Sequence, residues 1–290
     1  MTNFLGLTDE ESSYQNSNVV VLPIPYEGTV SYGKGTSKAP RCIIEASTQV
    51  ELYNEELGCE PFDVGVATLP ELKLDGVMPD DLFREIVPSV TKLLEDGKWP
   101  LILGGEHSIT PAAIKAYHDN NEELTVVQFD AHADLRSEYD GEAMSHACAM
   151  ARAREMYPAV QVGIRNISAK EIEQAKLKDY SIFFARDMHR DDRWMGSAID
   201  SIKTDKVYIT LDLDAFDGSI LPATGTPEPG GMNWWQVTEF LKILFEKKSV
   251  VGMDIVELAP IKGFHAYDFM VAKLAYKCIG YLRASKKKTN

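Results

Sequence analysis

The sequence predicts an α/β protein with a mostly parallel central sheet and helices on both faces. Short apolar runs alternate with longer amphipathic segments along almost the whole chain, a pattern typical of repeated β–α units. Four runs are nearly unbroken, as expected for strands covered on both sides; they span 99–103, 124–129, 206–213 and 249–255. No linker, repeat or low-complexity segment interrupts the alternation, so we expect one domain over residues 1–290.

In the first half of the chain, a polar N-terminal segment (1–18) precedes an apolar strand at 19–23. One helix carries clear terminal signals: Asp80 and Asp81 lie in its first turn and Gly97 follows its end. The periodicity predicts helices at 39–49, 79–95, 109–119 and 144–156, and strands at 99–103, 124–129 and 159–164.

In the second half, the helix at 233–246 has the strongest start signal. Asn233 stands at the N-cap with Gln236 three residues on, and Met232 and Val237 are spaced for a hydrophobic staple. The other expected elements are a helix at 169–177, strands at 181–184, 206–213 and 249–255, and a final helix at 265–283. The basic tail 284–290 is expected to be frayed.

Composition narrows the class of protein. Hydrophobic residues make up 44% and charged residues 26% of the 290 residues, enough for a full core without disulfides. The net charge of −14 argues against nucleic-acid binding and mildly favours a cationic substrate. Cys42, Cys59, Cys148 and Cys278 form no C-x-x-C pair, which suits a reducing cytosol. Without an apolar leader or membrane span, we expect a soluble cytoplasmic protein with no membrane partner.

Two further segments have ordinary explanations. Gly33-Lys34-Gly35-Thr36 lacks the spacing of a phosphate-binding loop, and we interpret it as an entrance or turn loop. Trp234 and Trp235 open a predicted helix, and we expect both to be packing residues.

Acids and histidines follow four of the predicted strands. Ligands of open α/β sheets bind beyond the carboxyl ends of the strands, where these residues fall. The segments are Gly104-Gly105-Glu106-His107, Asp130-Ala131-His132-Ala133-Asp134, Asp212-Leu213-Asp214 and Glu257. In extended backbone, residues two apart share a face, so we expect each D-x-H-x-D or D-x-D set to point one way.

A metal site explains this crowding best. One Asp at a strand end is usually a cap or turn residue. Four carboxylates and two histidines are different, because buried acids repel unless cations neutralise them. Four negative charges balance two divalent ions, and two ions about 3.5–4 Å apart can share and acidify a water molecule. A carboxylate-rich set without thiolates prefers hard ions. His107 alone would also fit a satisfied core histidine.

These segments resemble those of the ureohydrolase (arginase/agmatinase) family. The matching residues are Gly104-Gly105-Glu106-His107-Ser108, Asp130 to Asp134, Ser145-His146, Asp212 to Asp214 running into Pro222-Ala223-Thr224-Gly225-Thr226-Pro227, and Glu257. They occur in family order and cover most of the domain. The resemblance implies a three-layer α/β/α sandwich with a mostly parallel sheet.

The resemblance also implies residue roles. His107, Asp130, His132, Asp134, Asp212 and Asp214 match the six ligands of two Mn²⁺ ions, with Ni²⁺ as the alternative. His146 matches the proton shuttle, and Glu257 the acid that holds the guanidinium. The implied reaction is attack of a metal-bridging hydroxide on the guanidinium carbon, with release of urea and an amine.

The loop between D-x-H-x-D and His146 bears on the substrate. The loop, Leu135 to Met144, lacks the arginase Ser-Gly-Asn pattern and resembles that of agmatinases, as does Thr226 to Gly231. Its three acids would tolerate a terminal ammonium better than a carboxylate. Agmatine, giving putrescine and urea, is therefore the expected substrate. Ala147-Cys148 after His146, and Gly218 after Asp217, depart from the usual agmatinase residues and keep guanidinobutyrate, other guanidino acids, arginine and free guanidine open.

Two rival functions share this fold. A one-zinc deacetylase-type enzyme is disfavoured by the complete set of six ligands. A non-catalytic binding protein would usually lack a ligand or His146, and neither is missing. The resemblance further implies a homo-oligomer, a trimer or hexamer.

Overall fold

The central feature of the structure is one parallel sheet. The computed structural model describes residues 2–287, and within them eight strands pair in the order β2-β1-β3-β8-β7-β4-β5-β6, every neighbouring pair being parallel. The strands are β1 (Val19–Ile24), β2 (Val66–Thr68), β3 (Trp99–Gly104), β4 (Thr125–Phe129), β5 (Ala159–Ile164), β6 (Ser181–Phe184), β7 (Lys206–Asp212) and β8 (Ser249–Val256).

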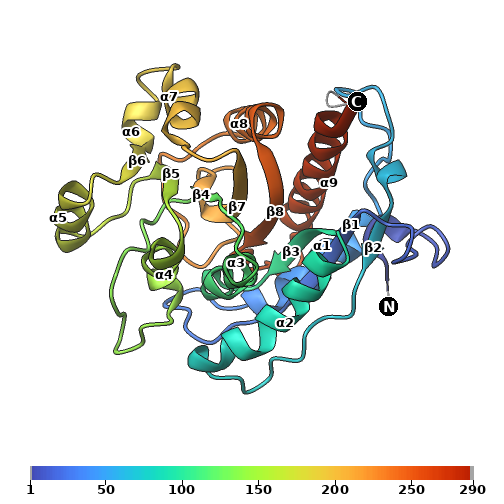
Figure 1. Cartoon of the computed structure of the whole chain (residues 1–290), viewed down its shortest axis with the longest axis horizontal. Coiled ribbons are helices and arrows are strands. Elements are labelled where there is room, and N and C mark those ends of the chain that lie inside the picture. Colours follow the sequence, from blue (N-terminus) through green and yellow to red (C-terminus); the bar gives the residue numbers. More distant parts are fainter. Residues whose placement is uncertain (1, 288–290) are drawn as a thin grey trace.

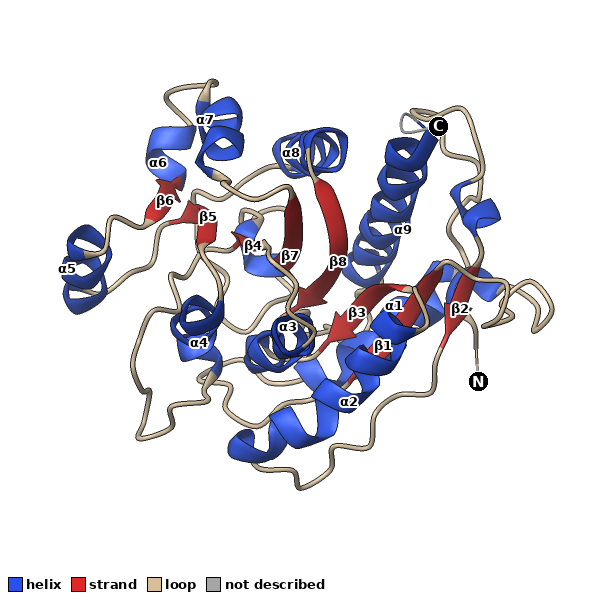
Figure 2. Ribbon diagram, in the orientation of Figure 1, coloured by secondary structure: helices blue, strands red, loops and turns tan. Residues whose placement is uncertain are grey.

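Nine α-helices are found among the described residues and surround the sheet (Figures 1 and 2). They are α1 (Ala39–Ser47), α2 (Leu82–Glu95), α3 (Thr110–Asp119), α4 (Ala149–Met156), α5 (Ala169–Leu177), α6 (Ala185–Met188), α7 (Trp194–Ser201), α8 (Trp234–Lys247) and α9 (Ala266–Lys287). None of them is long and apolar enough to cross a membrane.

The core consists of two apolar layers, one on each face of the sheet. Successive side chains of a strand enter different layers: Val19 and Val21 pack with residues of α1, α7, α8 and α9, whereas Val20 and Leu22 pack with residues of α2, α3 and α4. The period of two in a strand places neighbours on opposite faces, and helices cover both. Figure 2 shows α8 and α9 on one side of the sheet and α2, α3 and α4 on the other. The predicted α/β/α architecture is confirmed.

Most predicted elements occur within a few residues of their predicted bounds. The strands 159–164 and 181–184 and the helix 169–177 match β5, β6 and α5. The capping box of α8 forms, since the Asn233 side chain accepts the Gln236 N–H and Gln236 reaches back to the Asn233 N–H. Strand β2 and helices α6 and α7 were not predicted, because three- to eight-residue elements carry too little periodicity.

Four details of the prediction are wrong. Helix α4 starts at Ala149 rather than at 144, because Ser145 is extended and 146–148 form a 3-10 turn. The final helix continues through Lys287, so residues 284–287 are not frayed, while 288–290 lie outside the described residues. The segment 1–18 is not only a polar surface segment, because its residues Phe4, Leu5 and Leu7 are buried in the core.

The fourth detail concerns the two tryptophans. Trp234 stacks on Phe216, with ring centroids 6.4 Å apart, but Trp235 is 73% exposed and is therefore not the buried packing residue that we expected. All four cysteines are free thiols.

Candidate metal centre and active site

The sheet order brings the four polar strand ends together. Strands β3, β8, β7 and β4 are consecutive neighbours in the sheet, and all run the same way. Their carboxyl ends therefore meet at one edge, although the segments are spread from Gly104 to Glu257 in the chain.

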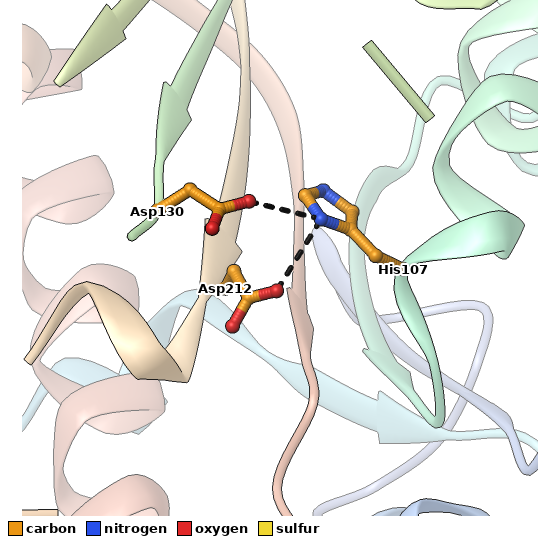
Figure 3. A group of neighbouring side chains, drawn as sticks. All are labelled: His107, Asp130 and Asp212. Carbon is orange, nitrogen blue, oxygen red and sulfur yellow. Dashed lines mark ion pairs between the residues drawn. The ribbon is translucent and has the colours of Figure 1, made fainter. Parts of the chain in front are cut away.

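One group of ligand atoms surrounds Nδ1 of His107. This nitrogen lies 3.2 Å from Asp130 Oδ2, 3.0 Å from Asp134 Oδ2 and 3.3 Å from Asp212 Oδ2. Figure 3 shows Asp130 and Asp212 pointing at this nitrogen from neighbouring strands. His107 and the three acids are all buried. The arrangement offers one imidazole nitrogen and three carboxylates to a single point.

A second group shares Asp130 with the first. His132 Nδ1 lies 2.8 Å from Asp214 Oδ2 and 3.6 Å from Asp130 Oδ1. Two sets of donor atoms that could hold an ion result, His107 with Asp130 and Asp212, and His132 with Asp130 and Asp214. Asp130 is the residue common to both.

The structure thus brings all six predicted ligands together, but the backbone does so differently from the expected extended strand. Strand β4 ends at Phe129, and Asp134 has a left-handed backbone with φ 51°. The turn is held by hydrogen bonds: the Ala131 N–H donates to Asp214 Oδ1 over 2.9 Å, and the Ala133 N–H to the Asn166 carbonyl over 3.1 Å. The expectation that i, i+2 and i+4 converge by strand alternation alone was wrong at Asp134.

A buried cation fits this cluster. His107 Nδ1 has no hydrogen-bond partner in a fully buried place, although three carboxylates surround it. Such an orphaned atom is expected where a metal ion is the intended partner. Histidine nitrogens and carboxylate oxygens without a thiolate are a donor set for hard or borderline divalent ions such as Mn²⁺.

The pKa shifts within the cluster also favour a bound cation. Burial, with the neighbouring charges of Asp214 and Asp130, raises the pKa of Asp212 well above its ordinary value. Burial opposes protonation of His132, but the carboxylates of Asp214 and Asp130 outweigh it and raise its pKa to about 12. The cluster therefore holds protons in place of the positive charge that its carboxylates require, and a metal ion would displace those protons.

Residues behind the ligands fix their orientation. His107 Nε2 lies 2.9 Å from Thr210 Oγ1, which contacts Thr110 Oγ1 at 3.2 Å, and Thr110 donates to Asp254 over 3.0 Å. On the other side, Gln128 donates to Asp130 Oδ2 and accepts from Gln161, each over 2.5 Å. The sequence motifs did not predict these residues. A usable signal existed for four of them, because Thr210, Asp254, Gln128 and Gln161 are polar side chains inside otherwise apolar strands, whereas Thr110 is the first residue of α3.

A cavity of about 230 Å³ opens onto the cluster. Its wall includes His107, His132, Asp134, Asp212 and Asp214 together with His146 and Glu257. The loop after β1 contributes Val30 to Gly33, and the Gly33 N–H donates to the Gly225 carbonyl over 3.1 Å. The prediction of an entrance loop around Gly33 is consistent with this position.

Glu257 is held in a fixed pose beside the cluster. Its backbone φ is 67°, a conformation that non-glycine residues rarely adopt, and its Oε1 accepts the His107 N–H over 2.7 Å. Burial and the nearby Glu106 carboxylate raise the pKa of Glu257 to about 8. A carboxylate in this position needs a cation in the cavity to be stably ionised.

The predicted substrate loop contributes two side chains to the wall of the cavity. Arg136 and Tyr139 line the cavity, with the guanidinium carbon 5.4 Å from the tyrosine ring centroid. The three acids of the loop are not among the lining residues: Glu138 and Asp140 are exposed, and Glu142 accepts the Met144 N–H over 2.8 Å. That these acids tolerate a terminal ammonium better than a carboxylate stays a prediction, and it would act from outside the cavity wall.

The comparisons with known proteins agree with the site. Residues 17–280 match the profile of the arginase family. The chain is 41% identical to an N(1)-aminopropylagmatine ureohydrolase of Synechocystis sp. over 96% of this chain and 93% of that protein. It is 31% identical to an agmatinase of Pyrococcus horikoshii over 92% of each.

A solved structure extends the likeness to the whole fold. The crystal structure of agmatine ureohydrolase of Thermoplasma volcanium superposes with a TM-score of 0.88 at 30% identity, over 99% of this chain and 96% of that one. The three-layer sandwich implied by the sequence motifs is therefore confirmed. On its sequence and its fold, the chain belongs to the arginase family.

Proposed function

We propose that this protein is a dinuclear amidinohydrolase that cleaves a cationic guanidino compound to urea and an amine. The observation that carries the proposal is the position of Glu257, a buried carboxylate hydrogen-bonded to the backbone of the ligand His107 and facing the same cavity. A guanidinium placed on Glu257 would have its carbon next to the cluster of acids.

His107, Asp130, Asp134 and Asp212 would hold one divalent ion, and Asp130, His132 and Asp214 the other, with Asp130 shared. Mn²⁺ is the proposed ion, with Ni²⁺ as the alternative, because the donors are hard or borderline. When bound, the ions would supply the acidity that converts water to a nucleophile near neutral pH.

Glu257 would orient the substrate. One of its oxygens is anchored by the His107 N–H, which leaves the carboxylate in a defined plane. A guanidinium presents N–H donors in a flat fork that matches a carboxylate. Because burial raises the pKa of Glu257 to about 8, its ionised form would be stabilised by a cationic substrate and not by a neutral amide.

His146 would donate a proton to the departing amine. It lines the cavity, and its ring meets the edge of Tyr139 with centroids 5.9 Å apart. An amine leaves a tetrahedral carbon poorly unless it is protonated, and an imidazolium is a suitable donor. This is the role that the sequence motif Ser145-His146 predicted.

Agmatine and N(1)-aminopropylagmatine are the proposed substrates. They share the guanidinobutyl end that Glu257 and the cluster would hold. The 41% identity to a protein named for the second compound favours it, while agmatine is the prediction from the loop pattern. Guanidinobutyrate, arginine and free guanidine lack the distal amine or carry a carboxylate.

Urea release tests the proposal. The purified protein would be loaded with Mn²⁺ or Ni²⁺ and assayed on N(1)-aminopropylagmatine, agmatine, arginine, guanidinobutyrate and guanidine. We expect turnover of the first two and little of the others. No urea from any compound would overturn the hydrolase assignment, and urea from arginine alone would overturn the substrate assignment. Incubation with an acetylated polyamine tests the deacetylase alternative, and we expect no release of acetate.

We further propose a cytoplasmic role in polyamine synthesis, as a homotrimer or hexamer. Light scattering coupled to gel filtration tests the assembly; a monomer of 32.3 kDa would contradict it.

A further inference from the structure

We propose that Glu106 and Thr29 determine which nitrogen of His146 carries a proton, and so aim its Nε2 at the departing amine. The inference rests on the proposed role of His146 as proton donor. It assigns Thr29, on the loop after β1, and Glu106, before His107, as positioning residues for a histidine far away in sequence.

Glu106 is a fully buried carboxylate whose contacts are all neutral hydrogen-bond donors. Its Oε2 accepts the Gly28 N–H over 2.8 Å and the Thr29 N–H over 2.7 Å. Its Oε1 accepts the Thr29 hydroxyl over 2.7 Å and the Ser108 hydroxyl over 2.6 Å. No ion pair with a Lys, Arg or His side chain is recorded for Glu106 within the described part of the chain. Four donors therefore use both carboxyl oxygens of Glu106 as acceptors.

The hydroxyl group of Thr29 connects Glu106 to His146 by hydrogen bonds. Its Oγ1 has one proton and two lone pairs, and three contacts use all of them. The proton goes to Glu106, whose Oε1 accepts the Thr29 hydroxyl. One lone pair accepts the His146 backbone N–H over 3.0 Å, and the other faces His146 Nδ1 at 3.1 Å.

The imidazole of His146 must then carry a proton on Nδ1. Without it, a nitrogen lone pair would face a lone pair of Thr29 Oγ1 at hydrogen-bond distance. Ser145 Oγ lies 3.3 Å from the same nitrogen and can also accept from it. The neutral ring therefore has its free lone pair on Nε2, and the protonated ring has its transferable proton there.

The proton balance follows. As the C–N bond breaks, its electron pair goes to the amine nitrogen, which takes the Nε2 proton of His146. His146 is left neutral with its proton still on Nδ1, and a proton of the attacking water restores it. Both protons of that water end on the departing amine, one of them through His146. A neutral ring that carried its proton on Nε2 would have its free lone pair on Nδ1, so Nε2 could not accept the proton of the attacking water.

Kinetics of Thr29 variants provide the first test. Thr29→Val keeps the shape of the side chain but offers His146 neither lone pair. We expect kcat to fall by about 10- to 100-fold, part of the roughly 10²–10⁴ that a general acid contributes, with KM and metal content little changed. Thr29→Ser keeps the oxygen and should restore most of the activity. Ser37→Ala, which removes a hydroxyl bound to Glu27 on the same loop, is the matched control and should behave as wild type.

Coupling to His146 separates this role from a general loosening of the cavity wall. In a His146→Ala background, Thr29→Val should have no further effect on kcat, because the group on which it acts is gone. Additive losses, a change in KM alone, or a serine variant that fails to recover would each overturn the inference. Glu106→Gln, whose amide can donate to Thr29 and let the hydroxyl donate to Nδ1, should reproduce the loss seen in Thr29→Val at unchanged metal content.

A spectroscopic measurement reports on the tautomer without any activity. Two-bond ¹H–¹⁵N correlation of ¹⁵N-histidine protein loaded with a diamagnetic divalent ion gives the protonated nitrogen, and the His146→Ala spectrum identifies the signal. We expect Nδ1–H for His146 in the wild type and loss of this preference in Thr29→Val. Nε2–H in the wild type would refute the inference even in an active enzyme. Absence of urea with Nδ1–H present would instead refute the proposed function.

Discussion

The side chain of Glu257 accepts the backbone N–H of His107 over 2.7 Å, although 150 residues separate them in the chain. The proposed substrate anchor is therefore attached to the residue that carries a proposed metal ligand. A shift of one would move the other, so a guanidinium held by Glu257 would keep a constant position relative to the proposed metal ligands. Four predictions concern this arrangement and the contacts around it, and a fifth concerns an ion-paired glutamate elsewhere in the fold.

The first prediction concerns the substrate anchor. Glu257→Gln keeps a hydrogen-bond acceptor for the His107 N–H but loses the charge that binds a guanidinium. We expect kcat/KM to fall about 10- to 100-fold, corresponding to one charged hydrogen bond of about 1.5–3 kcal/mol. Urea-release kinetics and metal analysis would measure this, with the exposed Glu173→Gln on α5 as control. A parallel loss of metal would show that Glu257 acts on the cluster instead.

The second prediction concerns Asp130, which both groups of ligand atoms share. Asp130→Asn removes a charge from each group, so metal and activity should be lost together. The bound metal would be counted by elemental analysis after gel filtration, beside Asp200→Asn, an exposed acid on α7. Full activity in the Asp130 variant would refute its role as a ligand.

The third prediction concerns the amides behind Asp130. Gln128 donates to Asp130 Oδ2, and Gln161, itself bound by Arg154 over 2.9 Å, donates to Gln128. Gln128→Leu should weaken metal binding by about 10- to 100-fold, the usual cost of losing a partner of a ligand. Gln161→Leu, one bond further away, should have a smaller effect. Metal titration by calorimetry would rank them; equal affinities in both variants and the wild type would contradict the prediction.

The fourth prediction concerns removal of the metal. The crowded carboxylates make the metal-free cluster costly, so chelation should lower the free energy of unfolding. Each site should recover about 2.7 kcal/mol when the ion is present at 100 times its Kd. Thermal unfolding of the chelated protein across a Mn²⁺ series tests this, with Asp130→Asn as the comparison that should respond little. An unfolding temperature that does not change with the Mn²⁺ concentration would argue against a buried ion.

The fifth prediction is a dependence of stability on pH away from the site. Burial opposes ionisation of Glu56, but hydrogen bonds from Lys277 and Lys242 outweigh it and hold its pKa below the ordinary value. A depressed carboxyl pKa stabilises the folded state above the unfolded-state pKa, and this contribution is lost as the pH falls.

Glu56→Gln should therefore lower the free energy of unfolding by about 1 kcal/mol at pH 7, a modest value because the glutamate side chain is 27% exposed. The difference from wild type should shrink below pH ~4, near the ordinary pKa of glutamate. Urea unfolding at several pH values measures it, with the exposed Glu55→Gln as control. A difference that grows on acidification would have the wrong sign.

Much of the fold could be predicted because local patterns encode it. The buried strands read as apolar runs since both of their faces are covered, as Val19 to Ile24 illustrate. The Asn233 and Gln236 capping box is specified within four residues. Short elements such as β2 could not be predicted, because a three-residue strand is defined by its pairing with β1.

The sequence by itself determined the chemistry of the proposed metal site: Asp130, His132 and Asp134 stand after one strand, Asp212 and Asp214 at the end of another. Only the tertiary structure decided which of them meet, because the order β3-β8-β7-β4 arises from long-range packing of strands that look alike locally. The same holds for the neighbours that tune the site. Thr29 lies beside His146, and Thr210 beside His107, across more than a hundred residues of chain, and no local pattern carries such a contact.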